Sequence, residues 1–226
     1  MGRKLVIMVE MDKEILIVDK PAGMSSFGVV ARVRRKLSEV AGRKVKVGHT
    51  GTLDPFATGL MILMVGKGTK RAGEFLKLDK EYVATARLGA RSTTGDPEGE
   101  VTETVGAEAP SEERVREVLA GLTGEIWQTV PRYSAVKIQG QRAYKLARAG
   151  KEVEMPQRQV RVYELELLRY EWPELVVRCR VSSGTYVRAL AERIGDELGV
   201  GAYLTALRRT QVGEYRVEEV EEGWIE

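Results

Sequence analysis

The chain has 226 residues, of which 43% are hydrophobic and 31% are charged, and its formal net charge is +3. This composition is typical of a globular protein with a real core, and no apolar run approaches the roughly 18 residues of a membrane span. With no signal-peptide pattern at the N-terminus, we expect a cytoplasmic protein that does not associate with a membrane. One cysteine excludes an internal disulfide, and one histidine with one cysteine excludes a zinc site built from those residues.

The N-terminal part of the chain alternates strand and helix signals. Apolar runs predict three strands, at residues 14–20, 44–47 and 59–65. After the first strand, Ser25 or Ser26 can N-cap a helix, because its hydroxyl can accept an orphan backbone N–H. This helix is expected to reach about Val40 and to end at Gly42.

The segment Val47 to Gly59 joins two of these strands. It holds three glycines, one proline, the carboxylate of Asp54 and the only histidine, His49. Such a segment is either a loop whose conformation presents Asp54 to a ligand, or a turn in which Asp54 only hydrogen-bonds the backbone. With so few other reactive residues, a carboxylate is expected to do the covalent or proton-transfer work of any enzyme built on this chain.

The rest of the chain predicts more strands with scattered helices. Strands are expected at residues 80–89, 100–105, 160–170 and 175–181, and helices at 69–76, 111–121, 141–149, 185–198 and 204–210. Tyr186 and Arg188 fall in the first turn of the 185–198 helix. A cation there is unfavourable for the helix dipole unless an anion lies close. The pattern indicates an α+β protein with one large mixed or antiparallel sheet.

The charges are unevenly distributed along the chain. Residues 32–46 carry seven basic side chains against one acidic one, residues 132–151 carry six basic side chains and no acidic one, and the tail after Gln211 is acidic. Two basic segments favour a polyanion such as nucleic acid as partner, although a charged stretch is also typical of a solvated helix face.

Six motifs in a fixed order resemble the bacterial tRNA pseudouridine-55 synthase family over nearly the whole chain. They are VDKPAGMSS at 18–26, GHTGTLDP at 48–55, KEY at 80–82 with RLG at 87–89, YSAVK at 133–137, GTYVR at 184–188 and LRRT at 207–210. The resemblance implies the pseudouridine synthase fold, without metal or cofactor. It also implies isomerisation of a uridine in the T arm of tRNA to pseudouridine.

The resemblance assigns catalysis to Asp54, Tyr82 and Arg188. The C1′–N1 bond must break, the base must turn, and C5 must bond to C1′. The carboxylate of Asp54 can stabilise positive charge at C1′, attack C1′, or take the C2′ proton, and these three roles stay open. Arg188 matches the arginine that pairs with this aspartate and lowers its pKa. Tyr82 matches the tyrosine that stacks on the flipped base.

The remaining site residues are implied to bind RNA. Tyr186 and Leu207 match positions that line the pocket, His49 matches a histidine that braces the space left by the flipped nucleotide, and Lys20 would orient the catalytic loop. The basic segment resembles a mobile insertion at about 131–152, whose side chains would contact phosphates of the T-arm stem-loop. Its candidate contacts are Arg132, Lys137 and Arg142.

The sequence departs from the family pattern in two ways. Family members usually continue into a small RNA-binding PUA domain, whereas this sequence ends at Glu226, and Ser183 replaces a lysine that often precedes the GTYVR motif. We therefore expect a single catalytic domain over residues 1–226, and a monomer. Two alternatives are a tRNA-binding or tRNA-folding module in which catalysis is dispensable, and an N-glycosidase acting on nucleosides.

Overall fold

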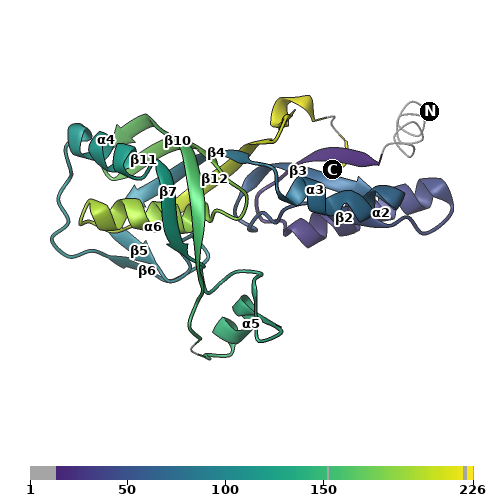
Figure 1. Ribbon diagram of the computed structural model, residues 1–226, viewed down its shortest axis with the longest axis horizontal. Coiled ribbons are helices and arrows are strands. Elements are labelled where there is room, and N and C mark those ends of the chain that lie inside the picture. Colours follow the sequence, from purple (N-terminus) through teal and green to yellow (C-terminus); the bar gives the residue numbers. More distant parts are fainter. Residues whose placement is uncertain (1–13, 152, 221–222, 226) are drawn as a thin grey trace. The chain divides into compact units, whose positions relative to one another are not determined.

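The computed structural model describes residues 14–151, 153–220 and 223–225. The chain forms two compact units, unit 1 (residues 1–83 and 207–226) and unit 2 (residues 84–206). Two strands, β4 (Lys80–Leu88) and β12 (Ala202–Val212), carry residues of both units. Figure 1 colours these elements along the sequence.

In unit 1 the strand order is β1-β3-β12-β4, with β2 also paired to β3 and β13 to β12. The strands are β1 (Ile15–Lys20), β2 (Val47–His49), β3 (Thr58–Val65) and β13 (Tyr215–Arg216), and the helices are α2 (Ser26–Ala41), α3 (Ala72–Leu76) and two 3₁₀ segments, Gly66–Arg71 and Val217–Glu219. Strand β3 is antiparallel to β1 and β2 and parallel to β12. It is buried from Gly59 to Val65, as its unbroken apolar sequence predicts.

Helix α2 begins and ends where its capping residues predict. The Ser25 hydroxyl accepts the Gly28 N–H at 3.0 Å, and Gly42 follows the last turn in the left-handed conformation, with φ of 63°. The apolar stripe of the helix is buried, including Val29, Val33 and Leu37. The first turn of α2 is therefore fixed beside the Pro21-Ala22-Gly23 turn that precedes it.

In unit 2 the strand order is β12-β4-β11-β10-β7, and two further pairs, β5-β6 and β8-β9, form separate small sheets. The elements are β5 (Ala90–Ser92), β6 (Val101–Glu103), α4 (Glu112–Gly121), β7 (Gly124–Thr129), β8 (Lys137–Ile138), β9 (Gln141–Arg142), α5 (Ala143–Arg148), β10 (Gln157–Glu171), β11 (Glu174–Val181) and α6 (Val187–Glu197). The segment with α5, between β7 and β10, projects from the rest of unit 2 (Figure 1). This segment holds residues 131–151, where the resemblance places the basic insertion.

The predicted fold class is confirmed: the protein is α+β with a large, mostly antiparallel sheet. The predicted helix at residues 204–210 is wrong, because these residues belong to strand β12. Leu, Ala and Arg favour a helix, but here pairing on both sides, with β3 and β4, overrides the local propensity. The short strand predicted at 44–47 lies further on, at Val47–His49.

The helix predicted from Thr185 begins two residues later, at Val187, so that Tyr186 is its N-cap and only Arg188 lies in its first turn. The helix predicted at 69–76 divides into the 3₁₀ segment Gly66–Arg71 and the short helix α3. No helix among the described residues is both long and apolar enough to cross a membrane.

Candidate active site

The segment between β2 and β3 (residues 50–57, here the catalytic loop) carries Asp54 and follows His49 directly. Its ends are fixed by backbone hydrogen bonds: Thr50 N–H donates to the Ile62 carbonyl, and Ala57 N–H donates to the Asp54 carbonyl, both at 3.1 Å. Asp54 itself is partly buried. The loop is thus attached directly to the buried strand β3, which is a rigid mounting for a reactive carboxylate.

Ser26, the first residue of α2, holds the residue that precedes Asp54. Its hydroxyl donates to the Leu53 carbonyl and accepts the Leu53 N–H, both at 2.8 Å, and the serine is buried. The Ser26 side chain therefore satisfies both backbone polar groups of Leu53, its N–H and its carbonyl. The sequence indicated Ser26 only as a possible helix cap, whereas Ser25 takes that role.

Lys20 is completely buried at the end of β1. Its ammonium group donates to the Pro55 carbonyl at 3.0 Å, and to the carbonyls of Pro21 and Met24 at 2.9 and 2.7 Å. The Gly23 N–H also donates to the Pro55 carbonyl, at 2.8 Å. Lys20 therefore holds the residue that follows Asp54, in agreement with its expected contact with this loop.

Arg209 in β12 reaches the same loop from the other side of β3. Its Nε donates to the Leu60 carbonyl at 2.7 Å and an Nη donates to the Gly51 carbonyl at 3.4 Å. Burial, and secondly the charge of Arg209, lower the pKa of His49 below its usual value of 6.5. Sequence analysis assigns no role to Arg209 beyond its membership of the LRRT motif.

Two other predicted residues of unit 1 lie on the paired strands β4 and β12. Tyr82 and Leu207 are each 7% exposed. Tyr82 belongs to the buried face of β4, as the alternation of the strand predicts.

Arg188 lies in the first turn of α6 in unit 2 and is buried. Its guanidinium lies 3.1 Å from a carboxylate oxygen of Asp96 and donates to the carbonyls of Thr94 and Tyr133 at 2.7 and 2.9 Å. The anion that a cation at this helix end requires is therefore present within unit 2. Tyr133 also joins Arg188 to the start of the basic insertion.

Asp96 is the functional candidate in unit 2 that the sequence did not identify. It is buried, and its Oδ1 accepts hydrogen bonds from the Thr94 hydroxyl at 2.6 Å and the Glu98 N–H at 3.0 Å. These local bonds are those of an aspartate in a turn. The second oxygen faces Arg188, 92 positions away, and no local pattern predicts that contact.

Tyr186 is held through its backbone. The buried side-chain amide of Gln128 in β7 accepts the Tyr186 N–H at 2.9 Å and donates to the Tyr186 carbonyl at 3.1 Å. The guanidinium of Arg158 lies 5.4 Å from the centre of the Tyr186 ring, which is within the range of a cation–π contact. Gln128 therefore holds the Tyr186 backbone and Arg158 contacts its ring, and sequence analysis selected neither residue.

The three predicted phosphate contacts of the insertion are exposed. Arg132 precedes β8, Lys137 begins it, and Arg142 ends β9. Arg142 donates a hydrogen bond to the Ala135 carbonyl within the insertion. All three are accessible to a ligand, and Arg142 also stabilises its own hairpin.

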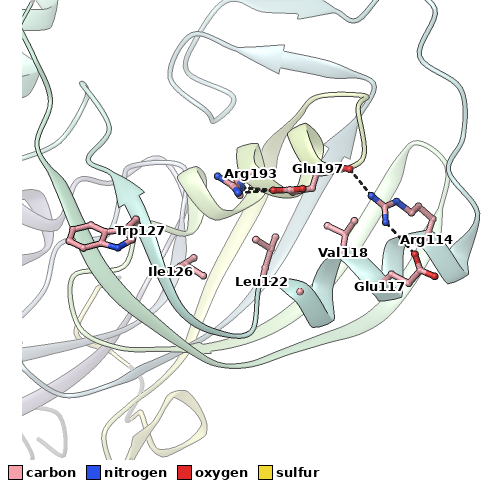
Figure 2. Close-up of a pocket in the computed structure, with 9 residues that line it drawn as sticks. Arg114, Glu117, Val118, Leu122, Ile126, Trp127, Arg193 and Glu197 are labelled. Carbon is pink, nitrogen blue, oxygen red and sulfur yellow. Dashed lines mark hydrogen bonds and ion pairs between the residues drawn. The ribbon is translucent and has the colours of Figure 1, made fainter.

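A separate cleft of about 470 Å³ lies in unit 2 between α4, β7 and α6. Its apolar surface includes Ile126 and the 66% exposed Trp127. Figure 2 shows that its charged residues interact with one another: Arg114 with Glu117 and the Glu197 carbonyl, and Arg193 with the Glu197 carboxylate. None of the predicted site residues lines this cleft.

Among the described residues, no group of three or more His, Cys, Asp and Glu side chains is placed to hold a metal ion.

Comparisons with known proteins agree with the arrangement of these motifs. A family model described as "TruB family pseudouridylate synthase (N terminal domain)" matches residues 35–187. The chain is 49% identical over 211 residues to tRNA pseudouridine synthase B of Bacteroides thetaiotaomicron, covering 91% of this chain and 88% of that protein. It is 47% identical over 213 residues to the protein of the same name from Thermobifida fusca, covering 91% and 71%.

Solved structures show the same fold. The chain is similar to a protein in a Cbf5-Nop10-Gar1 complex, with a TM-score of 0.69 and 30% identity. It is also similar to a chain of an H/ACA RNP bound to a substrate RNA containing 2′-deoxyuridine, with a TM-score of 0.66 and 28% identity. In both comparisons 93% of this chain is covered, and it spans about half the length of the other chain (52% and 50%). By its family match and by its identity to relatives over most of their length, the chain belongs to the TruB family of pseudouridylate synthases.

Proposed function

We propose that this protein isomerises the uridine at position 55, in the T arm of tRNA, to pseudouridine, with Asp54 as the catalytic carboxylate. The family membership supports an RNA isomerase, and the relatives named tRNA pseudouridine synthase B support tRNA as the substrate. The order of the motifs supports the position and the residue roles. No cofactor enters the proposed reaction, because bond cleavage and bond formation occur between the same base and sugar.

The proposal rests on the hydrogen bonds that fix the backbone of the catalytic loop. Ser26, Lys20 and Arg209 bond the backbone on both sides of Asp54. A reaction in which a base leaves C1′, turns and returns through C5 needs its carboxylate held at one position throughout. Fixing a reacting group in this way lowers the barrier, since its freedom is lost on folding and not in the transition state.

Arg188 is proposed to pair with Asp54 and keep it ionised. A guanidinium has five N–H donors in a planar fork and stays protonated at all relevant pH values. The bonds of Arg188 to Asp96, Thr94 and Tyr133 support this role, because they fix the direction of a buried cation. Whether the carboxylate attacks C1′, removes the C2′ proton or stabilises a cation stays open in this proposal.

The other residues are proposed to receive the RNA. Tyr82 stacks on the flipped base, and Tyr186 and Leu207 line its pocket. His49 occupies the space that the base leaves. Because the whole T arm must be held, exposed cations of the insertion contact its phosphates, and this binding weakens as salt rises. The candidate contacts are Arg132, Lys137 and Arg142. We propose that the protein acts as a monomer in the cytoplasm.

The test is to incubate the purified chain with a T-arm hairpin and map any pseudouridine formed. We expect product at the uridine equivalent to position 55, and none from Asp54→Asn, which should still bind the hairpin. Asp79→Asn, which changes a carboxylate of unit 1 outside the loop, is the matched control and should form product. Product at another position, or full activity of Asp54→Asn, would contradict the proposal. Binding and refolding of the hairpin without product would favour a tRNA-folding module instead.

A further inference from the structure

Arg209 lies in a row of three residues that runs across unit 1. Gly59 of β3 pairs with Lys20 of β1 on one side and with Arg209 of β12 on the other. Residues directly paired in a sheet project from the same face. Gly59 has no side chain and a φ of 105°, and a Cβ on it would lie 2.2 Å from the Arg209 carbonyl oxygen. The two cations therefore flank a position that only glycine can occupy.

A charge at this position is costly for the fold. Arg209 is 2% exposed, and its hydrogen bonds among the described residues go to the backbone carbonyls of Leu60 and Gly51. Removing a guanidinium from water without a carboxylate is unfavourable, and an apolar side chain of similar length would fill the volume at lower cost. Stability therefore does not account for an arginine here, whereas a role in the site does.

The two carbonyls that Arg209 binds lie on either side of Asp54. Gly51 is three residues before Asp54 and Leu60 is six residues after it. One planar guanidinium with donors in several directions can reach both carbonyls at once, whereas an ammonium group cannot do so with the same geometry. The arginine thus closes the base of the catalytic loop.

Arg209 and His49 both bond Gly51. The Gly51 N–H donates to Nδ1 of His49 at 3.4 Å, while the Gly51 carbonyl accepts from Arg209. An imidazole that accepts at Nδ1 is neutral and carries its proton on Nε2. Burial, and secondly the positive charge of Arg209, lower the pKa of His49 and so favour the same neutral form. Lys80 in β4 is a further buried cation, and burial, and secondly the charge of Arg209, lower its pKa.

We infer that Arg209 is a positioning residue, which clamps the Gly51 and Leu60 carbonyls so that the catalytic loop presents Asp54 and a neutral His49 to the RNA. Only the kinetic part of this inference rests on the proposed function. Its structural part, the clamp and the state of His49, can be measured on the free protein. It assigns Arg209 a role at a distance from the reacting atoms.

The test compares Arg209→Lys, which keeps the charge, with Arg209→Met, which removes it. Since the chain has one histidine, imidazole NMR gives a signal from His49 alone. In Arg209→Met we expect the pKa of His49 to rise, and in Arg209→Lys to stay below 6.5. In both variants, amide hydrogen exchange of residues 50–57 should become faster, while that of α2 should not change.

On a T-arm hairpin, both variants should lose about tenfold to a hundredfold in kcat with little change in KM, since misplaced reacting groups slow the chemical step. Arg208→Met is the control: Arg208 adjoins Arg209 but pairs with Asp19, so its removal should alter neither the His49 pKa nor the loop exchange. If Arg209→Met fails to fold, Arg209→Lys decides the outcome.

The inference is overturned if Arg209→Lys keeps the loop exchange and the kcat of the wild type. It is also overturned if a folded Arg209→Met leaves the His49 pKa unchanged. A wild-type protein that forms no pseudouridine would refute the proposed function only. In that case loop exchange and the His49 titration would still decide whether Arg209 is the clamp.

Discussion

The Arg188 guanidinium and the Asp96 carboxylate lie 3.1 Å apart, and their side chains are only 4% and 3% exposed. This pair joins the first turn of α6 to the turn that follows β5. Because the carboxylate is also bonded by Thr94 and Glu98, it is a fixed anion that sets the direction of the arginine. If Arg188 has the proposed role, Asp96 acts on catalysis through it.

We predict that Asp96→Asn loses most of its activity on a T-arm hairpin while hairpin binding falls much less. Asparagine keeps the shape but removes one carboxylate partner of the buried Arg188, which lowers the free energy of unfolding. Urea unfolding and single-turnover kinetics measure the two effects. The control, Asp196→Asn, breaks an exposed pair with Arg91 and should cost under about 1 kcal/mol with activity retained. Equal activity in the two variants would refute this role of Asp96.

Gln128→Met should disturb Tyr186 specifically. Methionine has a similar length but leaves the Tyr186 N–H without its acceptor, which costs about 1–3 kcal/mol, while the Tyr186 carbonyl still accepts the Leu190 N–H. We expect a lower free energy of unfolding and a lower kcat. Gln159→Met, which removes an exposed amide bonded to Glu125, is the control and should change neither quantity. A Gln128→Met protein with wild-type kcat would show that the amide does not position Tyr186 for catalysis.

Two neighbouring serines should separate helix stability from catalysis. Ser25→Ala removes the N-cap of α2 and should lower the free energy of unfolding by about 0.5–2 kcal/mol, with kcat retained. Ser26→Ala removes both hydrogen bonds to Leu53 and should lower kcat as well, because the residue before Asp54 is no longer held. Chemical denaturation and single-turnover rates of both variants provide the comparison. The same kcat in both would indicate that Ser26 only supports the fold.

Lys80 should give the protein a pH-dependent stability in the alkaline range. Burial, and secondly the charge of Arg209, lower its pKa from 10.5 to about 8, with Asp79 opposing the shift. Between these values the folded state has released a proton that the unfolded state still binds, so the free energy of unfolding rises with pH. Relative to Lys80→Met, the wild type should therefore gain stability from about pH 8 to pH 10.5.

The measurement for Lys80 is urea unfolding of both proteins across this range. Burial raises the pKa values of Tyr170 and Tyr215, so these residues contribute an opposite trend. They are present in both proteins and cancel in the difference. A difference in stability that does not change with pH would contradict the lowered pKa of Lys80.

The sequence alone determined the elements whose signals are local. The N-cap and C-cap of α2, the apolar run of β3 and the alternation of β4 depend on neighbouring residues, so they could be predicted within about two residues. The family motifs also predict Asp54, Lys20, His49 and Arg188 as site residues, and these assignments stay predictions. Their proposed chemistry rests on residue type and on motif order, both of which a sequence contains.

Only the tertiary structure decided how those residues are held. Strand β12 has a helix-like sequence and is extended because β3 and β4 pair with it. Asp96 and Gln128 act on residues 92 and 58 positions away, and Arg209 acts across Gly59 on a loop about 150 positions earlier. The partner of a buried polar side chain depends on how strands pair and helices pack. The residues beside it in the sequence do not indicate which distant residue that partner is. The supports of the site therefore appear only once the chain has folded.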